Sequence, residues 1–98
     1  MNRELKRQAE RQAALCSVFA NAKRVMIIWS LVEQERSVTD IALAIDASLQ
    51  NTSQHLHLMK KSGVVEARRD GQTVFYRIVG NGVRERCPLM FQRKELEK

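Results

Sequence analysis

The sequence has few of the residues that mark several classes of protein. Its 98 residues include only two cysteines, one proline and four glycines. Two cysteines cannot form the disulfide framework of a small secreted domain, so the composition favours a reducing cytoplasm. The sequence also lacks internal repeats, low-complexity tracts and linkers rich in proline, glycine or serine. We therefore expect a single cytoplasmic domain that spans residues 1–98.

Long apolar segments and catalytic motifs are lacking too. The longest uncharged apolar run, Val25–Trp29, is far too short to cross a bilayer. Met1–Gln12 is almost entirely polar, unlike a secretory signal. We find no glycine-rich phosphate loop, no recognisable pair of catalytic carboxylates and no nucleophile–base motif. We expect no enzymatic activity, no cofactor and no membrane partner.

Acidic residues are outnumbered by basic ones. The chain has 17 lysines and arginines against 11 aspartates and glutamates, which gives a formal net charge of +6. This balance favours an anionic partner but does not identify it.

Hydrophobic periodicity predicts a mainly helical chain with one small β-hairpin. Helical spacing of apolar residues covers four segments: residues 4–20, 22–34, 38–45 and 49–62. The last three segments each follow a residue that can cap a helix: Asn21, Ser37 and Ser48. A tight connection between the two short helices, residues 37–62 in all, is the helix-turn-helix arrangement.

The second half of the chain predicts strands and a final helix. Gly63 stands where a helix end favours positive φ, and strands are expected at 65–69 and 73–78. Asp70-Gly71 is the hairpin signal between them. A last helix is expected at 81–97, interrupted by Pro88.

The apolar positions predict which faces are buried. The first helix carries an apolar stripe of Leu5, Ala9, Ala13 and Cys16. The expected core positions of the helix-turn-helix segment are Ile41, Ala44, Ile45, Leu49, Thr52, Leu56 and Met59. In the second strand of the hairpin, Val74, Tyr76 and Ile78 alternate onto one face, which we expect to be the core face.

The predicted helix 49–62 leaves an uncharged, hydrogen-bonding face outward. Amides can pair with adenine through two hydrogen bonds, and hydroxyl groups reach bases or phosphates. The outward residues are Gln50, Asn51, Ser53, Gln54 and His57, with His55 near the boundary. Arginines at the hairpin that follows suit phosphate or a narrow minor groove. The alternatives are a merely polar surface helix and an edge strand whose charges prevent aggregation.

The two histidines, His55 and His57, do not form a metal site by themselves. Two residues apart on a helix, they point in roughly opposite directions, whereas a helical zinc pair needs a spacing of three or four.

These residues resemble the ArsR/SmtB family of winged helix-turn-helix repressors. The similarity covers roughly residues 13–96. Its most specific parts are Ser53-Gln54-His55-Leu56, Lys61-Ser62-Gly63-Val64-Val65 and Arg68 through Ile78. The resemblance implies a winged helix-turn-helix with its wing at 64–78, forming a homodimer through the first and last helices. It also implies a repressor that binds double-stranded DNA and is released by a metal ion, a metalloid or a redox signal.

The resemblance and the polar face together give a set of expected DNA contacts. His55 fits the family position that lies against DNA phosphate. The full set is Ser48, Gln50, Asn51, Ser53, Gln54, His55, Arg68, Arg69 and Gln72.

The sequence departs from the family at its metal sites. Relatives that sense metals carry Cys-x-Cys at the start of the third helix, where this chain has Ser37 and Thr39. The second family site uses histidine on the last helix, and residues 81–98 contain no histidine. We expect no metal site. Cys16 and Cys87, on helices that meet at the family dimer interface, are a candidate thiol switch for a redox or soft-metalloid signal; the alternative is two inert core cysteines.

The resulting expectation is a homodimeric repressor on a pseudo-palindromic operator. Two alternatives stay open: a winged-helix protein-interaction module without DNA sequence specificity, and a constitutive repressor without a sensing site. The sequence does not identify the operator, the regulated genes or the inducer.

Overall fold

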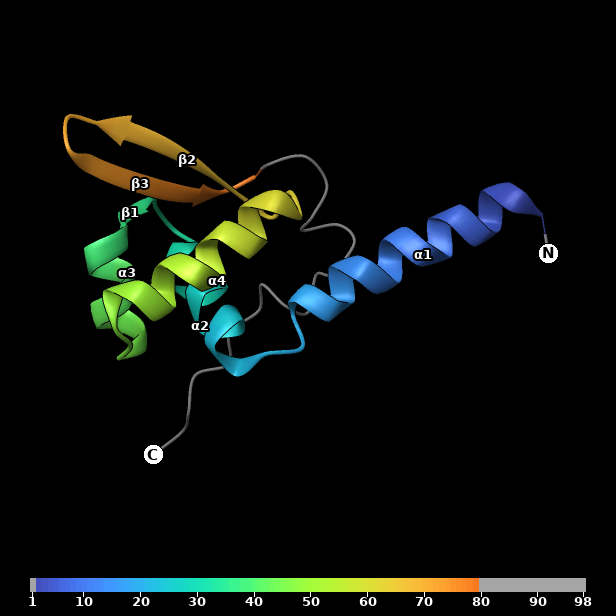
Figure 1. Cartoon of the computed structure of the whole chain (residues 1–98), viewed down its shortest axis with the longest axis horizontal. Coiled ribbons are helices and arrows are strands. Elements are labelled where there is room, and N and C mark those ends of the chain that lie inside the picture. The colour runs from blue at the N-terminus through green and yellow to red at the C-terminus, as the bar shows by residue number, and fades with distance from the viewer. Residues whose placement is uncertain (1, 80–98) are drawn as a thin grey trace.

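The computed structural model describes residues 2–79, and the predicted last helix, with Cys87 and Pro88, lies outside them. The described part contains α1 (Arg3–Val18), α2 (Ala22–Leu31), β1 (Arg36–Ser37), α3 (Val38–Ile45), α4 (Leu49–Lys61), β2 (Val65–Asp70) and β3 (Thr73–Ile78). Figure 1 shows α2, α3 and α4 gathered beneath the hairpin of β2 and β3, while α1 extends away from them. This is the predicted winged helix-turn-helix arrangement, with one additional short strand.

Side-chain caps start each helix. Asn21 accepts hydrogen bonds from the backbone N–H groups of Lys23 and Arg24, and Ser37 and Ser48 each accept one from the residue three positions on. These three caps confirm the predicted starts of α2, α3 and α4. Asn2 caps α1 in the same way.

The turn of the helix-turn-helix begins at Asp46, which ends α3 in the left-handed backbone conformation. Asp46 has φ 56° and ψ 53°, a conformation that aspartate tolerates better than most residues. The chain then reverses at once, and the N–H of Ala47 donates to the carbonyl oxygen of Ala42 at 3.0 Å. Gly63 ends α4 in the same region, with φ 79°.

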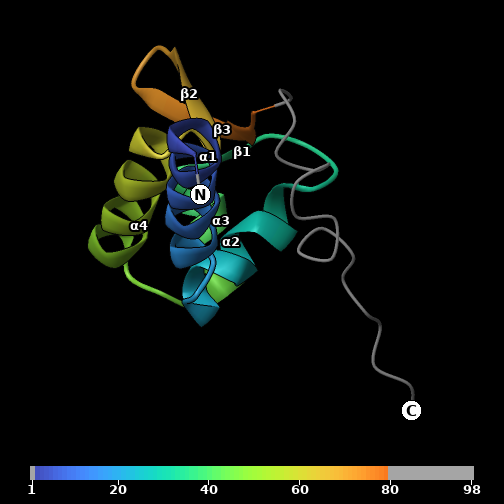
Figure 2. The same cartoon turned by 90° about the vertical axis from the view of Figure 1, so that its right-hand side faces the viewer.

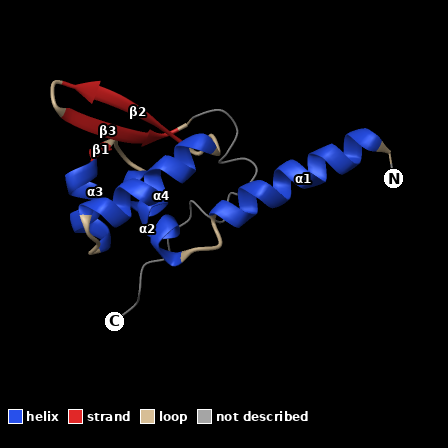
Figure 3. Cartoon of the chain, viewed as in Figure 1, coloured by secondary structure: helices blue, strands red, loops and turns tan. Residues whose placement is uncertain are grey.

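The three strands form an antiparallel sheet in the order β1-β3-β2 (Figure 3). Gly71 has φ 65° and forms the two-residue hairpin loop with Gln72, so Asp70 is the last strand residue. The predicted turn at Asp70-Gly71 is therefore shifted by one residue. β1 was not predicted because two residues are too short to show a strand pattern.

One core joins the helices α2, α3 and α4 to the sheet. It contains Ile27, Ile28, Ile41, Ile45, Leu56, Met59, Val64, Val65 and Tyr76. Val74 and Ile78 pack against it, which confirms the predicted core face of β3. Val18 and Phe19, at the end of α1, also belong to this core.

Three predicted details of the helices are wrong. α2 ends at Leu31 rather than at residue 34, and the Nε of Arg36 donates to the carbonyl oxygen of Ser30 at 2.6 Å. Ala44 is exposed and Ala42 is buried in its place, because Ala42 shares the face of Ile41 and Ile45.

The third wrong detail is Leu49, which was predicted to pack inward and is 54% exposed. It occupies the first turn of α4, beyond the end of the core, and the buried stripe of this helix begins only at Thr52.

Most of α1 has no packing partner in the described residues; Val18, its last residue, is the one that reaches the core. α1 extends away from the other helices in Figure 1, and in the turned view of Figure 2 it points toward the viewer in front of them. Its described side chains are exposed as far as Ser17, including Leu5 of the predicted apolar stripe at 50%. No single helix in residues 2–79 is both long and apolar enough to cross a membrane; α1 and α2 pass such a test only together, across a bend of 89°.

Candidate nucleic-acid interface

The outer face of α4 carries the polar residues that the sequence predicted. Gln50, Asn51 and Gln54 are exposed, and Ser53 is half-buried. Successive helical residues are separated by about 100°, so one outward line contains Gln50, Gln54, His57 and Lys61. A helix with amides at its start and a cation at its end can face base edges first and phosphate further along.

Ser48 and the N-terminus of α4 are fixed by the capping bond. The hydroxyl oxygen of Ser48 accepts from the N–H of Asn51 at 3.0 Å, and the side chain is exposed. The hydroxyl hydrogen of Ser48 can therefore still donate outward. The partial positive charge of the helix end favours an anion near this residue.

Two basic residues of α2 make hydrogen bonds to the helix-turn-helix. The ammonium group of Lys23 donates to the carbonyl oxygens of Ile45 and Asp46, at 3.0 and 3.5 Å. The guanidinium of Arg24 donates from Nε to Nδ1 of His55 at 3.2 Å and from Nη1 to the carbonyl oxygen of Val18 at 3.4 Å. These contacts tie the turn and α4 to α2.

His55 is half-buried and its Nδ1 is an acceptor. Burial lowers the pKa of His55 below its usual 6.5, and the nearby charges of Arg24 and Lys23 lower it further. In the neutral imidazole with an accepting Nδ1, the proton is on Nε2. His55 thus offers a single N–H donor, which suits the predicted phosphate contact.

The two faces of the hairpin differ in charge. Arg69 stands opposite Val74 in the register, on the face that continues the core, and makes no ion pair within the described residues. Arg77 stands opposite Glu66 and forms an ion pair with it. Arg69 is therefore the cation of the hairpin that is available to an anion.

Arg68, on the other face, is already engaged. Its guanidinium forms an ion pair with Glu35, lies 4.0 Å from a carboxylate oxygen of Asp70, and stacks 4.7 Å from the centre of the Phe75 ring. The hydrogen bond from Arg68 lowers the pKa of Glu35. Glu35 precedes β1, so this pair ties the hairpin to the body of the protein.

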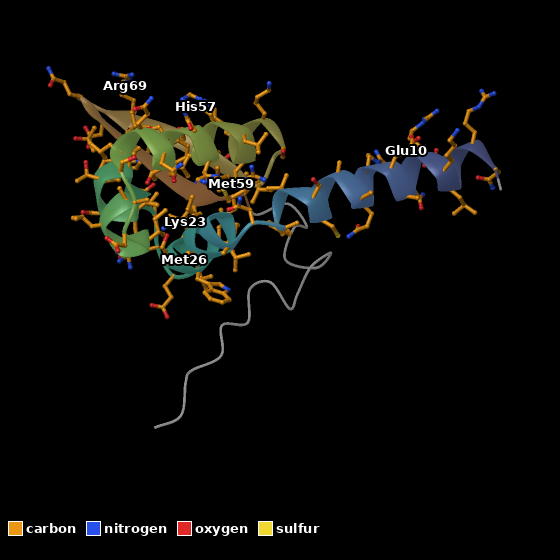
Figure 4. All side chains as sticks on the ribbon, turned by 60° about the horizontal axis from the view of Figure 1, so that its bottom comes forward. Glu10, Lys23, Met26, His57, Met59 and Arg69 are labelled. Carbon is orange, nitrogen blue, oxygen red and sulfur yellow. The ribbon has the colours of Figure 1, made fainter. Side chains whose placement is uncertain are left out.

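The polar face of α4 and the free arginine lie on one side of the molecule. In Figure 4, the labelled side chains of His57 and Arg69 project from the same side, and that of Met26 from the opposite one. Gln72 is exposed in the hairpin loop, three residues after Arg69 in the chain. The predicted contact residues Ser48, Gln50, Asn51, Ser53, Gln54, Arg69 and Gln72 thus belong to two neighbouring elements, α4 and the wing.

The candidate sensing residues are only partly described. Cys16 is exposed on α1, where the amide nitrogen of Gln12 lies 3.6 Å from its sulfur. It is therefore not a core residue of the single chain. Within residues 2–79, no three His, Cys, Asp or Glu side chains are grouped so that they could hold a metal ion.

Sequence reasoning missed the residues that hold the interface in place. Lys23 and Arg24 resemble ordinary helix-surface cations, and Glu35 resembles a loop residue. Their contacts join positions 22 to 33 residues apart, and a single sequence contains no signal for such pairing. Lys61, by contrast, could have been found by extending the outward line of α4.

Comparison with known proteins identifies the family. The family model of the bacterial regulatory protein, arsR family, matches residues 21–67. KmtR, an HTH-type transcriptional regulator of Mycobacterium tuberculosis, is 38% identical over 69% of this chain, which spans 52% of KmtR. The chain thus covers only about half of that relative.

Two further relatives are covered more fully. The biofilm growth-associated repressor of Xylella fastidiosa is 34% identical over 80% of this chain and 69% of its own length. The homodimeric winged helix-turn-helix DNA-binding domain of Mb0332 from Mycobacterium bovis superposes with a TM-score of 0.78 at 31% identity, over 92% of this chain and 81% of that one. The resemblance seen in the sequence is confirmed, and the chain belongs to the ArsR family of bacterial transcriptional regulators.

Proposed function

We propose that this protein is a homodimeric transcriptional repressor that binds double-stranded DNA at a pseudo-palindromic operator. The observation that carries the proposal is the pairing of an uncharged, hydrogen-bonding face on α4 with a free arginine on the wing. A helix of this kind fits the major groove, where amides distinguish bases, while the wing cation contacts the backbone. The net charge of +6 supports an anionic partner.

The experiment is selection of binding sites from a random DNA library, followed by affinity measurements over a range of salt concentrations. We expect one enriched, two-fold symmetric motif with half-sites about 34 Å apart. Affinity for the motif should exceed that for scrambled DNA by roughly 10³ or more. Enrichment of no motif would favour the alternative, a winged-helix module that binds proteins. That alternative does not require amides and hydroxyls along the outer face of α4.

The homodimer is proposed because the described side chains of α1 are exposed from Arg3 to Ser17, including the apolar Leu5. A helix of 16 residues is marginal in water unless it packs against something. A second copy of α1 offers the same apolar stripe, and Mb0332 is described as homodimeric. Two copies also supply the two recognition helices that a symmetric operator needs.

The regulatory signal is proposed to act on Cys16 and Cys87. Arg84 and Arg86 precede Cys87 closely in the sequence and would favour its thiolate. Peroxide can oxidise the two thiols to a disulfide and is itself reduced to water. Arsenite can bind both sulfurs, each thiol replacing one hydroxyl group of arsenic with release of a water molecule. Either product would shift the first helix against the last and change the spacing of the two recognition helices.

The thiol proposal is tested by operator affinity. We would compare the wild type with a Cys16→Ser, Cys87→Ser variant, both reduced and after peroxide, persulfide or arsenite. The proposal predicts weaker binding by the treated wild type and no change in the variant. Stoichiometric zinc, cadmium or nickel should release neither the wild type nor the variant from the operator. Equal affinities throughout would support a constitutive repressor.

A further inference from the structure

Leu49 is an unusual side chain for the surface of α4. It is the first residue of the helix and lies between Ser48 and Gln50, both of which are exposed. Leu49 is 54% exposed, at the N-terminal edge of the polar face, so about half of this residue is accessible to water. Neither α3 nor the sheet covers it, because the buried stripe of α4 starts one turn later, at Thr52.

The position of Leu49 matters for what it can contact. In a helix-turn-helix, the N-terminal residues of the second helix are the ones that reach base edges in the major groove. Amides and hydroxyls read hydrogen-bonding groups there, but the thymine 5-methyl group offers only an apolar surface. Leu49 is the apolar side chain in the first turn of α4, so it matches that one feature.

We propose that Leu49 is a specificity-determining residue that recognises a thymine by contact with its 5-methyl group. This inference rests on the proposed DNA-binding function and adds a base preference to it. Gln50 and Asn51 beside it would pair with neighbouring bases. The other leucine exposed on this helix, Leu58 at 39%, lies in the C-terminal half of α4, away from the end that reaches bases.

The test replaces thymine by uracil, which removes only the methyl group. Each thymine of the selected operator is substituted in turn by deoxyuridine in both half-sites, and affinity is measured for the wild type, Leu49→Ala and Leu58→Ala. Removal of this one apolar group should weaken wild-type binding roughly three- to fivefold per half-site at one position.

The variants decide the assignment. Leu49→Ala should bind the thymine and uracil operators equally at that position, while Leu58→Ala should keep the wild-type difference. Because Leu49 is exposed, we expect Leu49→Ala to unfold at the same temperature as the wild type. The inference is overturned if no thymine shows the difference, or if Leu49→Ala retains it. If the wild type selects no operator at all, the proposed function fails as well, and the two failures are thereby distinguished.

Discussion

Thr52 lies on the buried face of α4. Its hydroxyl oxygen, Oγ1, is buried and has no hydrogen-bond partner in residues 2–79. A buried hydroxyl without a partner costs free energy, and valine has nearly the same shape without it. We therefore expect Thr52→Val to leave the free energy of unfolding unchanged or to raise it by about 1 kcal/mol, measured by urea denaturation.

Thr52→Ala is the matched control for this prediction. It also removes the hydroxyl but leaves a cavity, so it should lower stability by about 1 kcal/mol. A comparable loss for both variants would mean that the hydroxyl has a partner, such as a bound water molecule.

A second prediction at the residue scale concerns His55 and the pH dependence of stability. The pKa of His55 is lowered in the folded protein. As the pH falls through 6.5, the unfolded chain therefore binds more protons at this residue than the folded protein does. The stabilisation is present above about pH 6.5 and is lost as the pH falls toward the lower pKa of the folded state. Urea unfolding of the wild type should show stability that falls as the pH is lowered from about 7.5 to about 5.5.

The His55→Asn variant keeps an acceptor for Arg24 but cannot be protonated in this range. We expect a flatter dependence of its stability on pH. His57→Asn controls for the loss of an imidazole from the same helix. An unchanged slope in His55→Asn would assign the pH dependence to other groups.

At the scale of the elements, the wing separates two kinds of arginine. Arg69 has no ion pair within the described part of the chain, whereas Arg68 is held by Glu35 and stacked on Phe75. Arg69→Ala should therefore reduce the salt dependence of DNA binding. The slope of log K against log salt should fall by about 0.9 for each phosphate that the protein no longer neutralises.

Arg68→Ala serves as the comparison. It should change this slope less, because the charge that it removes is already balanced by Glu35 and Asp70. Equal changes of slope for the two variants would show that Arg68 leaves Glu35 and also contacts phosphate.

The elements that could be predicted from the sequence are those with local signals. The caps at Asn21, Ser37 and Ser48, the positive φ of Gly63 and the alternation of β3 each depend on neighbouring residues. The end of α2 and the strand β1 depend on pairing beyond the local pattern, through Arg36 to Ser30 and through the register with β3. No helical or strand periodicity records those interactions.

The sequence also contains a local signal for the candidate interface, but this signal predicts only which face of α4 points outward. Its amides follow the helical period, so their outward direction was predictable. The engagement of Arg68, the orientation of His55 and the exposure of Leu49 depend on where the core ends and on which side chains meet across it. Those facts required the three-dimensional arrangement.

At the scale of the whole molecule, a two-fold symmetric operator requires two copies of the chain. The stripe of Leu5, Ala9, Ala13 and Cys16 lies on one side of α1, and Ala14 lies about 145° from its centre by helical geometry. In sedimentation at micromolar concentration we expect the wild type and Ala14→Glu to be dimers. Ala13→Glu should dissociate, because it places a carboxylate in the stripe. A monomeric wild type that also stays monomeric on DNA would refute the dimer.

If α4 contacts base edges, as proposed, the effect should be clearest at Gln54, which lies on the outward line of this helix. Affinities of the wild type and Gln54→Ala should be measured for the selected operator and for scrambled DNA of equal length, at several salt concentrations. We predict that Gln54→Ala loses about 1–3 kcal/mol on the operator, relaxes the preference at one base pair, and binds scrambled DNA like the wild type. Equal losses on both DNAs would contradict the claim and reduce α4 to a general contact surface.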